Sequence, residues 1–277
     1  MKSAVSHTSV WRNSGQKQSS DLLAVEEPLQ IRLEFGPESG RESTDLAVTM
    51  RTPGNDFELA VGFLFTEGII HASSDLLSVR YCEQVESDDE KENIVRASLR
   101  PGVDVDIRRL RRNFFTTSSC GVCGKQSIDQ VIQSCGEIEE QVRFTSSAVL
   151  EAPSKLRGGQ HVFEHTGGIH ASGLFNAKGE LILVREDVGR HNALDKLIGA
   201  ALELKLVPLS EYFLLVSGRA SFELVQKALM AGIPLMAAVG APSSLAVELA
   251  ASRNMTLMGF VKEHNFNLYT GKTRIVE

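Results

Sequence analysis

Residues 212–261 decide the fold, and they read YFLLVSGRASFELVQKALMAGIPLMAAVGAPSSLAVELAASRNMTLMGFV. Three apolar runs predict strands, at 212–216, 235–239 and 256–261. The two intervening segments have the apolar spacing of helices, at 221–231 and 243–252. Strands and helices that alternate with short connections are typical of an α/β layer with a largely parallel sheet. This stretch therefore predicts an α/β fold.

The same alternation extends towards the N-terminus. Strands are predicted at 169–175 and 180–186, followed by a helix at 190–204, and Ile128, Val131 and Ile132 indicate an earlier helix. The first third of the chain lacks this alternation of strands and helices. It predicts several strands and a single helix, at 57–65. Those strands are predicted at 29–35, 46–50, 77–82, 94–99 and 103–107. We therefore expect a disordered polar tail (1–20), a small α+β domain (21–115) and an α/β domain (116–277).

Composition excludes several classes of protein. The chain has 277 residues, with 29 Lys and Arg against 35 Asp and Glu, so its net charge of −6 argues against a nucleic-acid binder. No apolar run reaches the roughly 18 residues of a membrane-spanning helix. The first residues lack the apolar core of a signal peptide, and four cysteines are too few for a disulfide framework. We expect a cytoplasmic protein whose thiols stay reduced.

The sharpest motif is TTSSCGVCGK at 116–125, which places Cys120 and Cys123 in a glycine-rich loop before a predicted helix. A free thiol with a pKa of about 8.5 is only about one tenth thiolate near pH 7.5. A helix N-terminus contributes less than about one pKa unit. A nearby cation is therefore required for an ionised nucleophile, and Lys125 is the candidate.

Several interpretations of this Cys-x-x-Cys motif compete. Structural zinc normally takes two such pairs or additional histidines, whereas Cys82 and Cys135 stand alone. A zinc deaminase requires His-x-Glu upstream of the cysteines, but no histidine lies between His71 and Cys120. A thioredoxin-like dithiol is expected near the first strand and helix of the chain, and this pair is not there. Two unreactive exposed thiols would not explain the glycines. A nucleophilic sulfur carrier fits best, a zinc-stabilised binding module stays open, and we expect no structural metal.

Two turns follow predicted strands and precede predicted helices, at Ser217–Ser221 and Gly240–Ser244. In a parallel sheet both open on the same edge and offer free amides to an anion. With Ser217, Arg219 and Ser243 they suggest a phosphate-bearing ligand, although such turns are also ordinary helix caps. The polar segment 185–196, which contains His191, is either a ligand site or a solvated helix entry. His170, beside two glycines, could belong to the same ligand site. The cluster Arg108–Arg112 is a solvated face or a docking site for an anionic partner.

Six segments together resemble the formate dehydrogenase accessory sulfurtransferase family (FdhD/NarQ). The first three are RTPGNDFELA (51–60), SSCGVCGK (118–125) and REDVGRHNALDK (185–196). The others are SGRASFE (217–223), APSSLA (241–246) and FNLYT (266–270). The resemblance covers about residues 25–271. Gly240, Ser243 and Ser172–Gly173 depart from the family pattern, which affects only pocket detail.

The resemblance implies a carrier that takes persulfide sulfur from a cysteine desulfurase. The carrier passes this sulfur to the molybdenum of the bis(molybdopterin guanine dinucleotide) cofactor before the cofactor enters formate dehydrogenase. It implies Cys120 as the persulfide residue and Cys123 as its companion. It also implies a homodimer, a second domain resembling the cytidine deaminase fold and a cofactor-binding stretch at Phe260, Val261, Lys262, Glu263, His264 and Asn265. The alternative is a non-catalytic metallopterin-binding chaperone for formate dehydrogenase.

Overall fold

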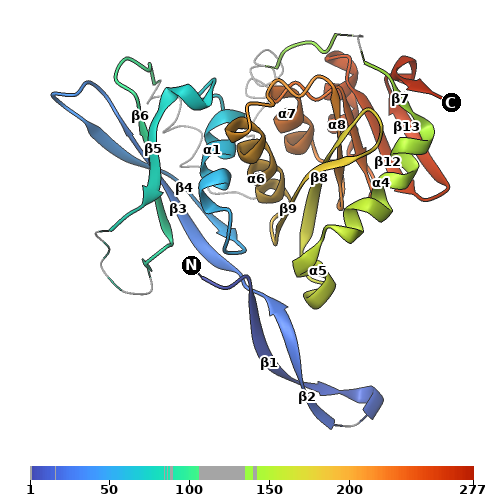
Figure 1. The fold of residues 1–277 in the computed structure, drawn as a ribbon, viewed down its shortest axis with the longest axis horizontal. Helices are drawn as coiled ribbons and strands as arrows, with labels where there is room; N and C mark the ends of the chain where they lie inside the picture. The colour runs from blue at the N-terminus through green and yellow to red at the C-terminus, as the bar shows by residue number, and fades with distance from the viewer. Residues whose placement is uncertain are drawn as a thin grey trace.

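Two sheets lie on either side of a central layer of helices in the computed structural model (Figure 1). The structure describes residues 2–15, 17–83, 85, 87, 90–105, 135–139 and 142–277. The predictions for the cysteine loop, the arginine cluster and the helix around Val131 lie outside these residues. No helix in the described part of the chain has the length and apolarity needed to cross a membrane.

The first sheet has four strands in the order β4-β3-β6-β5. Their bounds are β3 (Glu27–Phe35), β4 (Glu42–Arg51), β5 (Leu76–Tyr81) and β6 (Ile94–Leu99). Alternate residues of β3, from Leu29 to Phe35, are buried as the sequence alternation predicts. They pack towards helix α1 (Asp56–Thr66). This helix ends just before Gly68, whose backbone is left-handed (φ 71°). The predicted strand at 103–107 is not formed at 103–105.

The second sheet has six strands in the order β13-β12-β11-β10-β8-β9. Their bounds are β8 (His170–Asn176), β9 (Leu181–Asp187), β10 (Tyr212–Val216), β11 (Leu235–Ala238), β12 (Thr256–Lys262) and β13 (Asn265–Thr270). Only the pairs β10–β11 and β11–β12 are parallel, and the other three pairs are antiparallel. The expectation of a largely parallel sheet is therefore wrong. The hairpins β8–β9 and β12–β13 add antiparallel strands at the two sides.

Helices cover both faces of this sheet, which confirms the α/β class and its three layers. Leu214 and Val216 of β10 share a core with α6 (Arg190–Glu203), α7 (Phe222–Met230) and α8 (Ser244–Ser252). The alternate residues Phe213 and Leu215 share a second core with α4 (Ser146–Gly158). Helix α5 (His161–Thr166) follows α4, and β7 (Phe144–Thr145) pairs with β14 (Ile275–Val276). Single-turn 3₁₀ helices occur at Asn13–Gly15, Ser73–Asp75 and Lys272–Arg274.

The polar N-terminus is not the disordered tail predicted from its composition. Strands β1 (Val5–Arg12) and β2 (Lys17–Ala24) pair antiparallel over their full length. Each strand supplies the backbone partners of the other, so the hairpin forms without a large apolar content. The hairpin projects away from the rest of the molecule, and β2 approaches α5 near its base (Figure 1).

Helices α1 and α6 pack with their backbones in direct contact, which joins the two sheets through one continuous core. Glycines make this possible: a Cβ on Gly62 would lie 1.8 Å from the Asp195 carbonyl oxygen, and one on Gly199 would lie 1.9 Å from that of Glu58. The predicted domain boundary at 115/116 falls outside the described residues and stays a prediction.

The substitution Gly62→Ala tests this contact. The added methyl group would meet backbone rather than a movable side chain. We therefore expect the free energy of unfolding to fall by about 3 kcal/mol or more. Urea denaturation measures this loss. Gly158→Ala is the matched control, since nothing lies within 4 Å of the position of its added Cβ. Equal stability of the two variants would contradict the close packing.

Candidate functional site

The carboxyl ends of β10, β11 and β12 lie side by side at one edge of the six-stranded sheet. The turn Ser217–Ser221 follows β10, the turn Gly240–Ser244 follows β11, and Phe260 lies near the end of β12. The structure therefore brings together the two predicted phosphate-binding turns and the start of the predicted cofactor-binding stretch. We call this region the carboxyl edge.

Backbone hydrogen bonds join the elements of the carboxyl edge. Gly240 N donates to Gly218 O (2.9 Å), and Ser243 N donates to Ala220 O (3.0 Å). Phe260 N donates to Gly240 O (3.1 Å), which ties β12 to the same turn. A Cβ on Gly240 would lie only 3.1 Å from Arg219 Cγ, so the glycine allows the two turns to approach closely.

Three helices begin at this edge and direct their N-terminal amides towards it. Among the described residues, the N-cap positions of α6 and α7 form no side-chain cap, whereas Ser243 caps α8 by accepting from Ala246 N (3.3 Å). Ser217 Oγ accepts from Ala171 N (2.9 Å), so its own hydroxyl proton remains available as a donor. Arg219 is exposed between the turns. This donor set suits a phosphate or diphosphate group.

His170 and Arg190 adjoin the turn that contains Gly218. A Cβ on that glycine would lie 3.4 Å from His170 Nδ1 and 3.9 Å from Arg190 Cδ. The buried Nε of Arg190 has no hydrogen-bond partner among the described residues. Burial lowers the pKa of His170, and the charges of Arg190 and His191 lower it further, against a smaller opposing effect of Asp187. His170 is therefore a neutral imidazole near pH 7.

His191 links the starts of α6 and α7. Its Nε2 lies 3.2 Å from Ser221 Oγ and 3.0 Å from Glu223 Oε2. The sequence placed His170 and His191 in polar segments that could bind a ligand or could be merely solvated. The structure places both at the carboxyl edge. Glu223 was missed, since nothing in its helical context distinguishes it from a solvent-facing carboxylate.

The start of α6 is held by the buried carboxylate of Asp187. Its Oδ2 lies 2.7 Å from Lys196 Nζ and accepts from Thr52 N (3.1 Å). Its Oδ1 accepts from Gly189 N (2.8 Å) and from Asn192 Nδ2 (3.2 Å). The motifs at 51–60 and 185–196 therefore meet in three dimensions. Their shared role is to fix the helix start from which Arg190 and His191 extend.

Phe260 occupies a strained position beside the turns. Its φ is 54°, a conformation that is rare for a bulky residue, and the register of β12 and β13 shifts between Gly259 and Lys262. Lys262, Glu263, His264 and Asn265 are exposed where β12 turns into β13, as a ligand-binding role requires. Val261 is different: it is 1% exposed and packs in the α4 core, so its side chain is not available to a ligand.

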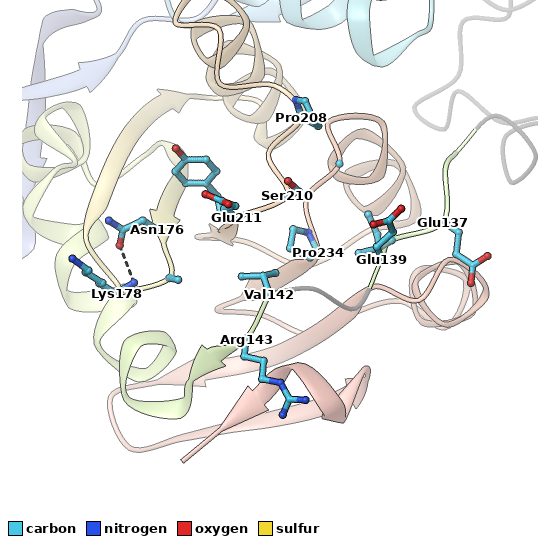
Figure 2. Close-up of a pocket in the computed structure, with 14 residues that line it drawn as sticks. Glu137, Glu139, Val142, Arg143, Asn176, Lys178, Pro208, Ser210, Glu211 and Pro234 are labelled. Atoms are coloured by element: carbon cyan, nitrogen blue, oxygen red, sulfur yellow. Dashed lines mark hydrogen bonds between the residues drawn. The ribbon is translucent and has the colours of Figure 1, made fainter.

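A separate hollow of about 930 Å³ lies near the opposite edge of the sheet (Figure 2). Its lining includes Tyr212 at the start of β10 and Asn176 at the end of β8, the ends that face away from the carboxyl edge. Glu137, Glu211, Arg143 and Lys178 give it mixed charge. No predicted site residue in the described part of the chain lines it.

The structure does not describe the predicted catalytic residues of the cysteine motif. Cys120, Cys123 and Lys125 lie outside the described residues, so their roles and the absence of structural zinc remain predictions. Cys82 and Cys135 are both buried, and neither is one of the two cysteines of the predicted motif.

Comparison with known proteins decides the relationship. The sequence pattern of the FdhD/NarQ family matches residues 24–276. The chain belongs to this family. A relative from Streptomyces coelicolor, named sulfur carrier protein FdhD, is 50% identical over 92% of this chain and 89% of its own. A relative of the same name from Saccharolobus solfataricus is 39% identical over 95% of both chains.

A solved structure from Desulfotalea psychrophila, described as a putative formate dehydrogenase accessory protein, has the same fold. Its TM-score is 0.72 at 20% identity, and the match covers 98% of both chains. This similarity supports the mixed α/β architecture over nearly the whole chain. The more specific resemblance to the cytidine deaminase fold stays a prediction.

The lowered pKa of His170 predicts a pH dependence of stability. An unfolded histidine takes up its proton near pH 6.5, whereas folded His170 does so only at lower pH. The unfolded chain then binds more protons below about pH 6.5, so this histidine destabilises the fold as the pH falls. We expect His170→Gln to lose less stability than the wild type between about pH 7 and 5, measured by urea denaturation. His7→Gln on the hairpin is the matched control, and identical slopes for His170→Gln and wild type would contradict the assignment.

Proposed function

We propose that this chain is a sulfur carrier that serves the maturation of formate dehydrogenase. The observation that carries the proposal is family membership over 24–276, with relatives named sulfur carrier protein FdhD. A cysteine desulfurase supplies the sulfur, and the bis(molybdopterin guanine dinucleotide) cofactor of molybdenum receives it as bound substrate. The protein acts in the cytoplasm, as a homodimer, and as a sulfurtransferase with a cysteine persulfide.

Loading requires one nucleophilic displacement. The Cys120 thiolate, stabilised by Lys125, attacks the terminal sulfur of the donor persulfide. The donor S–S bond breaks, the donor cysteine leaves as a thiolate, and Cys120 carries the persulfide.

Discharge requires a second thiol. The Cys123 thiolate attacks the inner sulfur of protonated Cys120 persulfide and displaces hydrosulfide, the species that the metal centre accepts. The two thiol sulfurs supply both electrons and end as a Cys120–Cys123 disulfide. A cellular dithiol then reduces this disulfide by exchange, which restores both thiols and leaves the reductant as a disulfide.

The carboxyl edge holds the guanine dinucleotide part of the cofactor. Its support is chemical: uncapped amides of α6 and α7, exposed Arg219 and the orphaned Nε of Arg190 are donors that a diphosphate would satisfy. No phosphate-binding GxxxxGK[ST] motif occurs in the sequence, so amides and arginines replace its lysine. Ser217 and Ser243 add hydroxyl groups at the ends of β10 and β11.

Intact-mass analysis tests the sulfur-carrier proposal directly. After incubation with a cysteine desulfurase and cysteine, we expect a gain of about 32 Da per sulfur atom, and peptide mapping should place it on Cys120. Cys123→Ala should load but release no hydrosulfide, because the displacing thiol is missing. Loading on Cys82 or Cys135 would contradict the assignment. A Cys120→Ala protein that still supports formate dehydrogenase would favour the chaperone alternative.

Calorimetry tests the nucleotide site with guanosine diphosphate (GDP) as the probe. We expect wild-type protein to bind GDP more tightly than adenosine diphosphate. Arg219→Ala should weaken GDP binding by about 10- to 100-fold, because one charge-assisted bond to phosphate is lost. Arg12→Ala, an exposed arginine on the hairpin, is the matched control. Absence of GDP binding at millimolar concentration would remove the nucleotide part of the proposal and leave the thiol chemistry.

A further inference from the structure

Three arginines lie side by side across the four-stranded sheet. Arg32 of β3 pairs in register with Arg96 of β6, and Arg96 pairs in register with Arg80 of β5. Residues directly opposite each other on neighbouring strands point to the same face of a sheet. Neighbouring strands are about 4.8 Å apart, so the backbone positions of the three arginines span only about 10 Å. We call Arg32, Arg96 and Arg80 the arginine row.

The arginine row lies on the face of the sheet that looks away from helix α1. Ile31, Val95 and Val79 each precede one of the arginines, and all three pack in the core that contains α1. Strand alternation therefore turns the arginines to the opposite face. In the described part of the chain, no helix covers that face (Figure 1). Arg80 is exposed and the other two arginines are half-buried, so the row is open to a partner.

Two carboxylates lie on this face near the row, and each already has an arginine partner. Asp45 pairs with Arg32 at one end of the row, with Oδ1 2.7 Å from Nε. Glu34 accepts from Ser98 Oγ (2.6 Å) and lies 3.6 Å from Arg41. The positive charge of the row is therefore only partly neutralised by the residues that the structure describes.

Arg96 lies between the other two arginines and is incompletely satisfied. Its buried Nε has no hydrogen-bond partner among the described residues. Like charges directly opposite each other on neighbouring strands destabilise a sheet, whereas charges of alternating sign would keep the face soluble without this cost. An anion that lies over the row would reduce the repulsion and offer an acceptor to the unpaired Nε.

The surroundings of the row indicate the class of partner. Gln30 precedes Arg32 by two residues and shares its face, and Val48 lies directly opposite Gln30. Val48 and Met50 are 66% and 47% exposed, although both are apolar. Methionine and arginine are enriched at protein interfaces, and guanidinium groups bind carboxylates in bidentate pairs. The surface therefore suits an acidic protein segment better than a nucleic acid.

We infer that the arginine row, together with Val48 and Met50, is a docking surface for an acidic segment of a partner protein. The inference goes beyond the proposed function, since it involves neither the cysteine motif nor the carboxyl edge. Carboxylates of the segment pair with the guanidinium groups, and its apolar side chains contact β4. The net charge of −6 on the whole chain disfavours an acidic partner elsewhere and guides it to this face.

A labelled peptide of glutamates with two leucines is the probe, and fluorescence anisotropy at low salt measures its binding to the full chain. We expect Arg80→Gln/Arg96→Gln to weaken binding by about 5- to 30-fold and to flatten its salt dependence, because two charge pairs are lost. Arg80→Gln alone changes only an exposed side chain, so it should fold normally and show part of the loss. Arg12→Gln/Lys17→Gln is the matched control, since it removes a cross-strand pair of exposed cations from the hairpin.

Each other outcome overturns the inference. Wild-type protein that fails to bind the peptide at low salt would exclude the docking surface, while leaving the sulfur loading measured by intact mass unaffected. Unchanged affinity in both arginine variants, or an equal loss in the hairpin control, would show that the row is not where the peptide binds. An oligothymidylate of matched charge that binds as tightly as the peptide, with the same losses, would show a surface for polyanions in general rather than for a protein.

Discussion

The buried carboxylate of Asp187 is the interaction on which the candidate site depends. It ends β9, accepts from the first sheet's connecting loop at Thr52, pairs with Lys196 and accepts from Gly189 at the start of α6. A fully buried charge is tolerated only when it is paired and hydrogen-bonded. Here the partners come from the loop that contains Thr52, from the start of α6 at Gly189 and from Lys196 within α6. One side chain thus couples the packing of the two sheets to the position of the helix start that carries Arg190 and His191.

Chain direction does the rest of the assembly. Because β9, β10, β11 and β12 all point the same way, the turns and helix starts that follow them collect at one edge. Short-range sequence patterns are enough to locate each turn. Their convergence follows from sheet topology, and the antiparallel partner β8 brings His170 at its start to the same edge.

The parts of the fold that could be predicted are those encoded in local periodicity. Strand β10 has the predicted bounds, and α6, α7 and α8 begin and end within a residue or two of them. Helix α4 was missed because Pro153 lies inside it, and proline normally ends a helix. The hairpin β1–β2 was missed because its stability comes from pairing rather than from apolar content. Val261 was assigned to a ligand because a contiguous stretch was carried over whole, whereas strand alternation buries it.

The projecting hairpin β1–β2 has a consequence for exchange with solvent. Among the described residues, its ladder hydrogen bonds join only its own two strands, and the exposed faces around Trp11 and Leu23 contribute little buried apolar area. Opening it therefore breaks no contact in the core around α1 and α6, so its amides exchange hydrogen through a local fluctuation rather than through global unfolding. Within the described part of the chain, a slowly exchanging core around α1 and α6 thus adjoins a rapidly exchanging arm, and a protease would reach this arm before it reaches that core.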